Sequence, residues 1–399
     1  MKLWQQVIVA MVSGIMFGAL FPDYVLYVKP VGTLFLRLIK MIIVPMIFFS
    51  LVTGITSMSD PSSLGRVGLK ATIAFTVTTC FAVVFGLFVA ILIEPGRGVN
   101  IDLGNKNITV SEKFYLDAFL VNIVPENIVQ AFAENNILQV VFFAIFTGIC
   151  INNLGSTVAP VKTLFLSISK LVLRMMNIII QSSPYGAFAL MAWLVGSQGL
   201  VVLIGLSKLV GAVVLAMVVQ YAIFGILIYV SCNLSPMPFY KKSIPYQLIA
   251  FSTSSSKASL PTTMDICRDE LGISDSSASF ILPLGAAINM DGLAINLGLT
   301  TLFFAQVAGV DLSYTDYIMI IITATLGSIG GAGIPGASLI MLPMVLSSVN
   351  LPIEGVAILA GIDRILDTLR TTINITGDAT VTLIIDYSEG TFDKDKYYS

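Results

Sequence analysis

Long apolar segments separated by short polar breaks make up most of the chain. A helix needs about 20 mostly apolar residues to cross the hydrocarbon core of a bilayer. By this measure the pattern predicts spans at 4–20, 31–55, 67–93, 137–151, 161–194 (interrupted near Ser182-Ser183-Pro184), 201–230 and 280–304. We therefore expect an all-α polytopic membrane protein.

After residue 243, two apolar segments are each divided by a polar or glycine-rich tip. Ile244–Ile266 is interrupted by Ser252–Pro261, and Ile318–Leu346 is interrupted by Gly327–Ser338. Each segment predicts a re-entrant hairpin of two half-length helices. Non-helical backbone is tolerated at membrane depth only where it is buried in protein or faces a cavity. A plain loop, or close helix packing through small residues, would also produce the glycine-rich tip.

The last predicted span, Asp363–Asp378, has one polar face. At about 100° per residue, this face carries Asp363, Asp367, Arg370, Thr371, Asn374 and Asp378. Ionisable side chains in a membrane span are costly and normally mark a substrate or ion path. The alternative is a surface helix with a solvated charged face, but the flanking apolar segments argue against it.

Composition narrows the chemistry further. The chain has 399 residues, of which 56% are hydrophobic and 11% charged, with a net charge of −2. This balance predicts no nucleic-acid partner. There is no histidine, which excludes Ser-His triads and His-ligated metals. The four cysteines have no CxxC spacing and are expected to be reduced. The N-terminus lacks a small-residue cleavage site and predicts a retained first span.

The polar residues suit an anion and a hard cation together. Backbone N–H groups at the two tips favour an anionic ligand. Carboxylate, amide and hydroxyl oxygens suit a hard cation, and the small number of carboxylates favours a monovalent ion over calcium. Arg370 offers a fork matched to a carboxylate, and Asp367 can hold an ammonium about one turn away. Alternatively, Arg370 forms an internal ion pair with Asp367 or Asp363.

Four motifs together resemble the dicarboxylate/amino acid:cation symporter family, the glutamate transporter homologues. They are Ser254-Ser255-Ser256, Asn289-Met290-Asp291-Gly292, Gly333-Ile334-Pro335-Gly336, and Asp367 to Asn374 with Gly377-Asp378. The resemblance covers nearly the whole chain. It implies eight spans and two re-entrant hairpins with inverted repeats, in a homotrimer that works as an elevator. Residues 1–65 and 95–199 would form the scaffold, and residues 66–94 and 200–399 the transport domain.

The resemblance also implies roles for particular residues. Arg370 would bind the substrate's side-chain carboxylate and Asp367 its amino group, with the rest of the substrate shell from Ser254, Ser255, Ser256, Ile334, Gly336, Thr371 and Asn374. It implies two to three sodium ions per cycle, with a proton as the alternative. One sodium site would use Asp378, Asn374 and carbonyls of Gly285 and Asn289; a second, carbonyls around Ser328, Ile329, Gly331 and Ala287; a third, Asp291, Asn289, Thr78, Thr79 and the Phe75 carbonyl.

The chain departs from the family pattern at three positions. Leu293 replaces a frequent threonine, Lys257 adds a cation beside the serine tip, and Leu297 replaces a glutamate of animal members. The long outer loops of animal members are missing, which indicates a prokaryote and a multi-pass protein of its inner (cytoplasmic) membrane.

Five functions fit the pattern to different degrees. The main prediction is a sodium-coupled symporter for glutamate or aspartate, and the alternative is a proton-coupled C4-dicarboxylate symporter, whose members generally lack an Asp at position 367. Neutral amino acid carriers generally lose the Arg at position 370. An anion channel would use Arg37, Lys40 and Lys257. An enzyme is not expected, because Arg370 lies between Asp367 and Asp378 and argues against an Asp-Asp protease.

Overall fold

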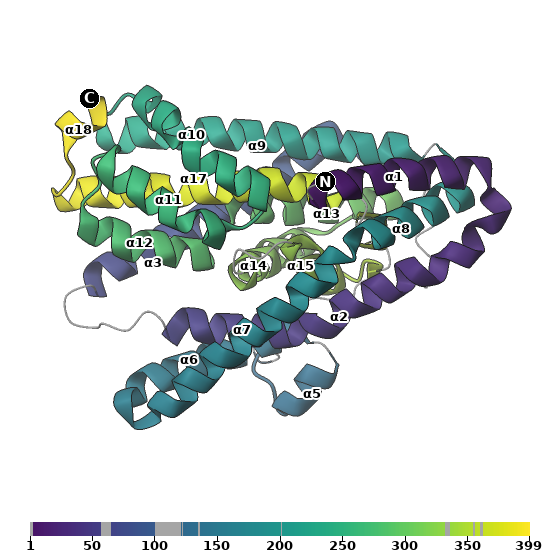
Figure 1. Ribbon diagram of the computed structural model, residues 1–399, viewed down its shortest axis with the longest axis horizontal. Coiled ribbons are helices and arrows are strands. Elements are labelled where there is room, and N and C mark those ends of the chain that lie inside the picture. The colour runs from purple at the N-terminus through teal and green to yellow at the C-terminus, as the bar shows by residue number, and fades with distance from the viewer. Residues whose placement is uncertain are drawn as a thin grey trace.

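The structure is a computed structural model that describes residues 3–56, 65–99, 121, 123–134, 136–200, 202–331, 336–353, 356–359 and 362–399. These residues form helices and no strand (Figure 1). The predicted site residue Ile334 lies outside the described residues, as does most of the predicted polar loop after Val99.

The helices of the first half follow the predicted apolar segments. They are α1 (Leu3–Leu20), α2 (Val25–Thr56), α3 (Gly65–Ile93), α5 (Ile128–Ala133), α6 (Ile137–Leu154), α7 (Ala159–Gln181) and α8 (Ser183–Gln198), with short 3-10 helices η1 (Pro22–Tyr24) and η2 (Gly155–Val158). The predicted interruption at Ser182 is confirmed, because α7 ends and α8 begins there. Pro30 and Pro45 both lie inside α2, which continues through them.

The second half forms two pairs of contacting helices where hairpins are predicted, and a helix break where the broken span is predicted. Its helices are α9 (Val202–Cys232), α10 (Pro236–Thr253), α11 (Ser256–Asp269), α12 (Asp275–Ile288), α13 (Asp291–Ala308), α14 (Tyr314–Gly330), α15 (Ala337–Ser348), α16 (Val356–Leu359), α17 (Asp363–Glu389) and α18 (Lys394–Tyr398). Helix α10 contacts α11, and α14 contacts α15. The first break is narrower than expected: it falls at Ser254, which is left-handed at φ 53°, whereas Pro261 lies inside α11.

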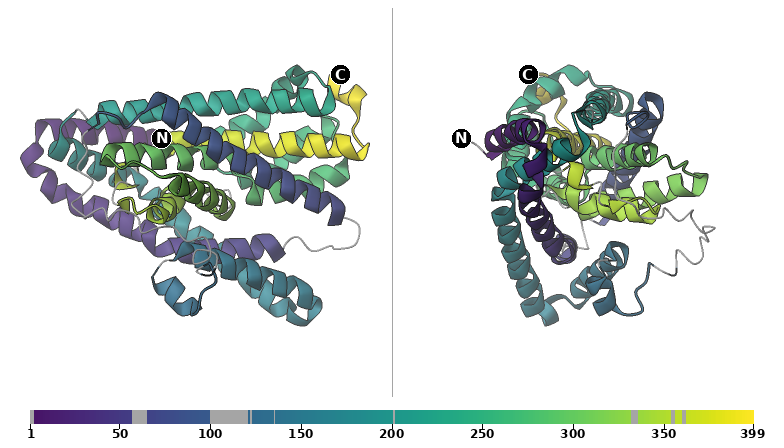
Figure 2. Two further views of the ribbon diagram at one scale, coloured as in Figure 1. Left: turned by 180° about the vertical axis from the view of Figure 1, so that it is seen from behind. Right: turned by 90° about the vertical axis from the view of Figure 1, so that its right-hand side faces the viewer.

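Helix contacts fall into two sets. Helices α1, α2, α6, α7 and α8 form one set, and α3, α9 to α15 and α17 form the other. Figure 2 shows α6 and α7 away from the bundle that contains α9 and α17. The sets meet where α14 contacts α2 and α6, where α15 contacts α2, where α8 contacts α9, and where α1 contacts α17.

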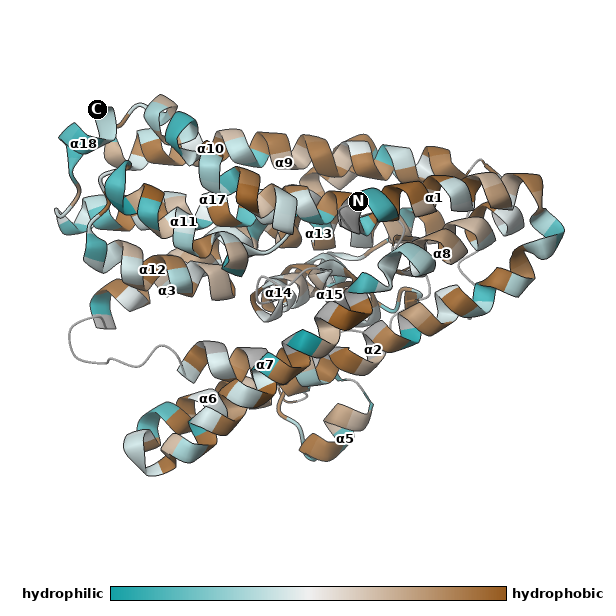
Figure 3. Cartoon of the chain, viewed as in Figure 1, coloured by the Kyte–Doolittle hydropathy of each residue, from teal (hydrophilic) through white to brown (hydrophobic). Residues whose placement is uncertain are grey.

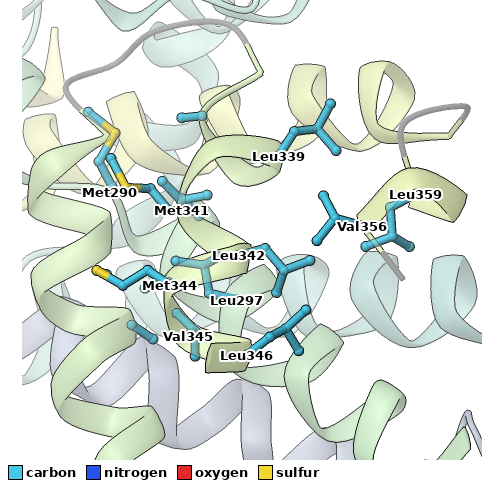
Figure 4. Packing of buried hydrophobic residues seen from close by; sticks show 14 of the residues in the cluster. Met290, Leu297, Leu339, Met341, Leu342, Met344, Val345, Leu346, Val356 and Leu359 are labelled. Carbon is cyan, nitrogen blue, oxygen red and sulfur yellow. The ribbon is translucent and has the colours of Figure 1, made fainter. Parts of the chain in front are cut away.

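The main apolar core fixes the second hairpin against α13. Leu297 of α13 lies beside Met341, Leu342 and Val345 of α15 (Figure 4). A Cβ added to Gly327 would lie 2.7 Å from the terminal methyl carbon of Met344. Small residues thus let α14 and α15 approach closely, so part of the glycine-rich pattern serves helix packing.

Several helices are long and apolar enough to cross a membrane. Within the described part of the chain they are Arg66–Ile93, Phe142–Met176, Val202–Cys232 and Asp275–Ala308, with a fifth if Gln5–Leu20 and Pro22–Phe35, bent by 110°, count as one span. Figure 3 shows apolar residues predominating along α9 and polar residues at α18. The chain is thus compatible with a polytopic membrane protein, and the count of eight spans stays a prediction.

The end of the chain folds back onto the base of the first hairpin. Lys242 Nζ donates to the carbonyl oxygens of Glu270 (3.0 Å), Lys396 (2.9 Å) and Tyr397 (3.1 Å). Burial raises the pKa of Tyr397, whose hydroxyl donates to the Ser235 carbonyl oxygen at 2.8 Å. One ammonium therefore joins carbonyls at the C-terminal ends of α11 and α18, where helix dipoles favour a cation.

Candidate functional site

The polar face of α17 is buried. Asp363, Asp367, Arg370, Thr371, Asn374 and Asp378 are each at most 5% exposed. A solvated surface helix is thereby excluded. Buried charges need partners or a counter-ion, and the contacts of these side chains therefore define the site.

Arg370 is held by two carboxylates of its own helix. Its Nη1 lies 2.8 Å from Asp363 Oδ1, and its Nη2 lies 2.9 Å from Asp367 Oδ1. The internal ion pair that the sequence allowed is therefore present, with both partners at once. Because two carboxylates share one guanidinium, the three side chains keep one net negative charge.

The second hairpin reaches the same two carboxylates. The backbone N–H of Gly336 donates to Asp367 Oδ2 at 3.0 Å, and Ser338 Oγ donates to Asp363 Oδ1. Gly336 precedes α15 and is left-handed at φ 78°, a conformation that favours glycine. The first turn of α15 is thus bonded to the polar face of α17.

A second cluster of polar side chains lies where α3, α17 and the break before α13 meet. Asn289 Nδ2 donates to Asp378 Oδ1 at 2.9 Å, and Thr79 Oγ1 donates to Asp291 Oδ1 at 3.1 Å. Thr78 and Thr79 also lie 3.4 Å from Asn289 Oδ1. This arrangement brings together all the side chains predicted for the third sodium site.

Two carboxylate oxygens in this group are buried and lack a hydrogen-bond partner within the described part of the chain. They are Oδ2 of Asp291 and Oδ2 of Asp378. A buried carboxylate oxygen without a partner is costly, and a hard cation or a proton would compensate it. The donors are all oxygens, which fits sodium better than a transition metal.

Glycines allow these side chains to approach. A Cβ added to Gly377 would lie 2.9 Å from Asn289 Nδ2 and 3.0 Å from Asp291 Oδ2. A Cβ added to Gly285 would lie 2.7 Å from Asp378 Oδ1. Both glycines therefore make room for the carboxylates.

Comparison with known proteins identifies the family to which the chain belongs. Residues 3–388 match the profile of the sodium:dicarboxylate symporter family. The chain belongs to this family. Similar proteins named C4-dicarboxylate transport protein come from Rhodospirillum rubrum (35% identical, 99% of this chain and 90% of the relative), Rhizobium meliloti (36%, 98% and 90%) and Bordetella avium (34%, 98% and 90%). The resemblance found in the motifs is confirmed, and the protein is a transporter, not an enzyme.

In this symporter the serines of the first tip, Ser254, Ser255 and Ser256, have two different environments. Ser255 Oγ accepts from the backbone N–H of Ala258 at 3.3 Å and caps α11. The Oγ atoms of Ser254 and Ser256 are buried without a partner in the part of the chain that is described. The two buried hydroxyls remain candidates for the substrate, while Lys257 is exposed beside them.

Thr371 and Asn374 have partners inside the symporter. Thr371 Oγ1 donates to the Asp367 carbonyl oxygen at 2.8 Å. Asn374 Oδ1 accepts from the Gly292 N–H at 2.8 Å, and its Nδ2 lies 3.2 Å from Met290 Sδ. Asn374 thus joins α17 to the α12–α13 break, whereas Thr371 bonds within α17. The substrate and cation roles of both residues stay predictions.

The carbonyls predicted for the second sodium site come from the end of α14 and from α12, which contact each other. Ser328 Oγ bonds within its own helix, to Ala324 O at 2.7 Å. The Gly331 N–H donates to the Gly327 and Ser328 carbonyls at 2.9 and 3.1 Å. Ile329 and Ala287 are half-buried. In the third site the Phe75 carbonyl accepts from Thr78 Oγ1 at 3.1 Å.

Sequence reasoning missed one pair at the site, Ser338 with Asp363. Asp363 was expected as part of the polar face and as a possible ion-pair partner of Arg370, but not as a partner of the second hairpin. The available signal was its position one turn before Asp367. Nothing in the sequence indicates that a serine of α15 reaches it.

Proposed function

We propose that the protein is a secondary active symporter that imports a C4 dicarboxylate together with cations. The observation that carries the proposal is the buried guanidinium of Arg370, which offers a forked donor for a carboxylate at the centre of a buried polar face. The names of the bacterial relatives support a C4 dicarboxylate over the glutamate or aspartate predicted first.

The charge of the site supports cation coupling. Asp291, Asp363, Asp367 and Asp378 are four buried carboxylates, and Arg370 is the one cation among these five side chains. Their formal charge is therefore −3, and a dianionic substrate would make it more negative. Cations must enter with such a substrate, because buried uncompensated charge is strongly disfavoured. We propose two to three sodium ions, with protons as the alternative.

An acidic amino acid is the second candidate, and Asp367 favours it. Aspartate has the C4 dicarboxylate skeleton with an added ammonium group. Asp367 is buried beside Arg370, and its Oδ2 accepts from the Gly336 N–H at 3.0 Å. A carboxylate at this position suits an ammonium. Glutamate would need the same contacts with one more methylene.

The wider proposal follows the two sets of contacting helices. Residues 1–65 and 95–199 would form a static scaffold, and residues 66–94 and 200–399 a moving transport domain. The two sets of contacting helices, α1–α2–α6–α7–α8 and α3–α9–α17, support this division. A homotrimer, an elevator motion and the cytoplasmic membrane of a prokaryote belong to the same proposal, and the bacterial relatives support the last of these.

Uptake into proteoliposomes tests the function. Radiolabelled succinate, aspartate and glutamate are each offered with a sodium gradient alone and with a proton gradient alone. We expect concentrative uptake of succinate or aspartate, driven by sodium. Protein-free liposomes and gradients collapsed by ionophores are the controls. Absence of uptake for all three substrates under both gradients would contradict the proposal.

A further inference from the structure

One oxygen atom joins the second hairpin to the guanidinium. Asp363 Oδ1 accepts from Ser338 Oγ on α15 and lies 2.8 Å from Arg370 Nη1. Ser338 is 2% exposed and Asp363 is 5% exposed. The hydrogen bond from Ser338 and the ion pair with Arg370 are therefore both shielded from water, where charge-assisted contacts are strongest.

The neighbouring carboxylate repeats the arrangement. Asp367 accepts from the Gly336 N–H with Oδ2, and its Oδ1 lies 2.9 Å from Arg370 Nη2. The first turn of α15 therefore bonds to both carboxylates that hold the guanidinium. A displacement of that turn would remove a donor from each carboxylate.

The packing of α15 makes such a displacement collective. Leu342, Val345 and Leu346 are buried in the core that α15 shares with α13 (Figure 4). Because protein interiors are densely packed, one of these side chains cannot move far without the others. The position of Ser338 thus follows the position of the whole helix.

We propose that Ser338 is a positioning residue that acts through Asp363 to orient Arg370, so that the seating of α15 and the orientation of the guanidinium are coupled. A forked donor recognises a carboxylate only in the correct plane. Asp363 therefore transmits the position of α15 to the carboxylate-binding group. The inference rests on the proposed function only in taking a carboxylate as the ligand of Arg370.

Hydrogen exchange at residues 336–340 tests the coupling without any substrate. We expect Ser338→Ala to speed exchange there by roughly 10-fold, because it removes one hydrogen bond to a charged group. Ser338→Thr should retain the hydroxyl and stay near the wild-type rate. Ser347→Ala, at an exposed position of the same helix, is the matched control.

Arg370 supplies the decisive comparison, because the two carboxylates that hold it, Asp363 and Asp367, lie on its own helix α17. Arg370→Gln should also change exchange at residues 336–340 at least several-fold, and the Ser338→Ala/Arg370→Gln double variant should fall short of additivity. Additive effects, or an unchanged rate in Arg370→Gln, would overturn the coupling. Size-exclusion chromatography of each variant identifies any that fail to fold, and Ser338→Ala with Ser338→Thr then decides the local bond.

Substrate binding provides a separate test of the positioning role of Ser338. With sodium present, Ser338→Ala should weaken succinate or aspartate binding by roughly 10-fold, and Ser338→Thr should restore it. If the wild-type protein binds neither compound, the proposed function fails, whereas the exchange rates still decide the coupling. Wild-type affinity in Ser338→Ala, with binding otherwise intact, would overturn the positioning role.

Discussion

Asn289 donates a hydrogen bond from Nδ2 to Asp378 Oδ1 at 2.9 Å, and so joins the break between α12 and α13 to the middle of α17. The other oxygen of Asp378 is buried without a partner in the described part of the chain. Asp378 therefore has one oxygen fixed by the protein and one available to a cation.

Removing the charge of Asp378 or Asp291 should weaken cation coupling. Asp378→Asn and Asp291→Asn each replace a buried carboxylate that a cation would compensate. We expect the sodium concentration for half-maximal substrate binding to rise by roughly 10-fold or more, since a bond to a charged group is worth about one to two decades. Titration of sodium at fixed succinate or aspartate measures this.

A matched control separates cation binding from stability. Asp386 is equally buried on α17, but Ser274 and Thr391 donate to it. Asp386→Asn should lower thermal stability and leave the sodium midpoint of the folded protein unchanged. Unaltered sodium dependence in both Asp378→Asn and Asp291→Asn would refute the cation assignment.

The sequence predicts the local parts of this site well. Helical periodicity alone places Asp363, Asp367, Arg370 and Asp378 on one face, and that face is buried. Polar breaks in apolar segments likewise predict the break between α10 and α11 and the break at Asn289. These features depend on a single helix or a single break, which the residues in one window determine.

The sequence does not predict contacts between segments that are far apart along the chain. Ser338 with Asp363 and Lys242 with Tyr397 join elements whose relative placement depends on packing. The expectation that Pro261 marks a helix break was also wrong. Pro261 is the sixth residue of α11, where it removes one intrahelical hydrogen bond without ending the helix. Such a proline is tolerated where neighbouring groups in a packed membrane protein satisfy the freed backbone carbonyl.

Lys242 should hold the end of the chain on the first hairpin. Lys242→Met removes the ammonium that three carbonyls share. We expect faster hydrogen exchange at residues 391–399 and a loss of about 1–3 kcal/mol, toward the lower end because Lys242 is only half-buried. Lys241→Met, its exposed neighbour, is the control and should behave as wild type. Equal exchange in both variants would contradict this role.

Glu389 predicts a pH-dependent contact between α17 and α3. Hydrogen bonds from Lys70 and then Arg66 lower the pKa of Glu389. A carboxylate with a lowered pKa in the folded protein stabilises it fully above the unfolded pKa of about 4.3. That contribution is lost as the pH falls through the lower, folded pKa.

The melting temperature of Glu389→Gln should therefore lie below that of the wild type at pH 7. The difference should shrink below about pH 4 and in high salt, because the ion pairs are on the surface. Glu270→Gln, at an exposed carboxylate, is the control. A difference that persists unchanged at low pH would show that packing, not charge, is responsible.

Substrate choice should be divided between Arg370 and Asp367. Arg370→Cys removes the carboxylate fork, so the affinity for acidic substrates should fall by about 10²–10⁴-fold if two charge-assisted bonds are lost. Arg268→Cys, on the exposed part of α11, adds the same thiol elsewhere as a control.

Asp367→Ser removes the ammonium partner and keeps the fork. The ratio of succinate to aspartate affinity should then rise, although loss of the Gly336 contact will weaken both. Competition between the two compounds measures that ratio directly. Wild-type affinity for acidic substrates in Arg370→Cys would make Arg370 a structural ion-pair residue held by Asp363 and Asp367.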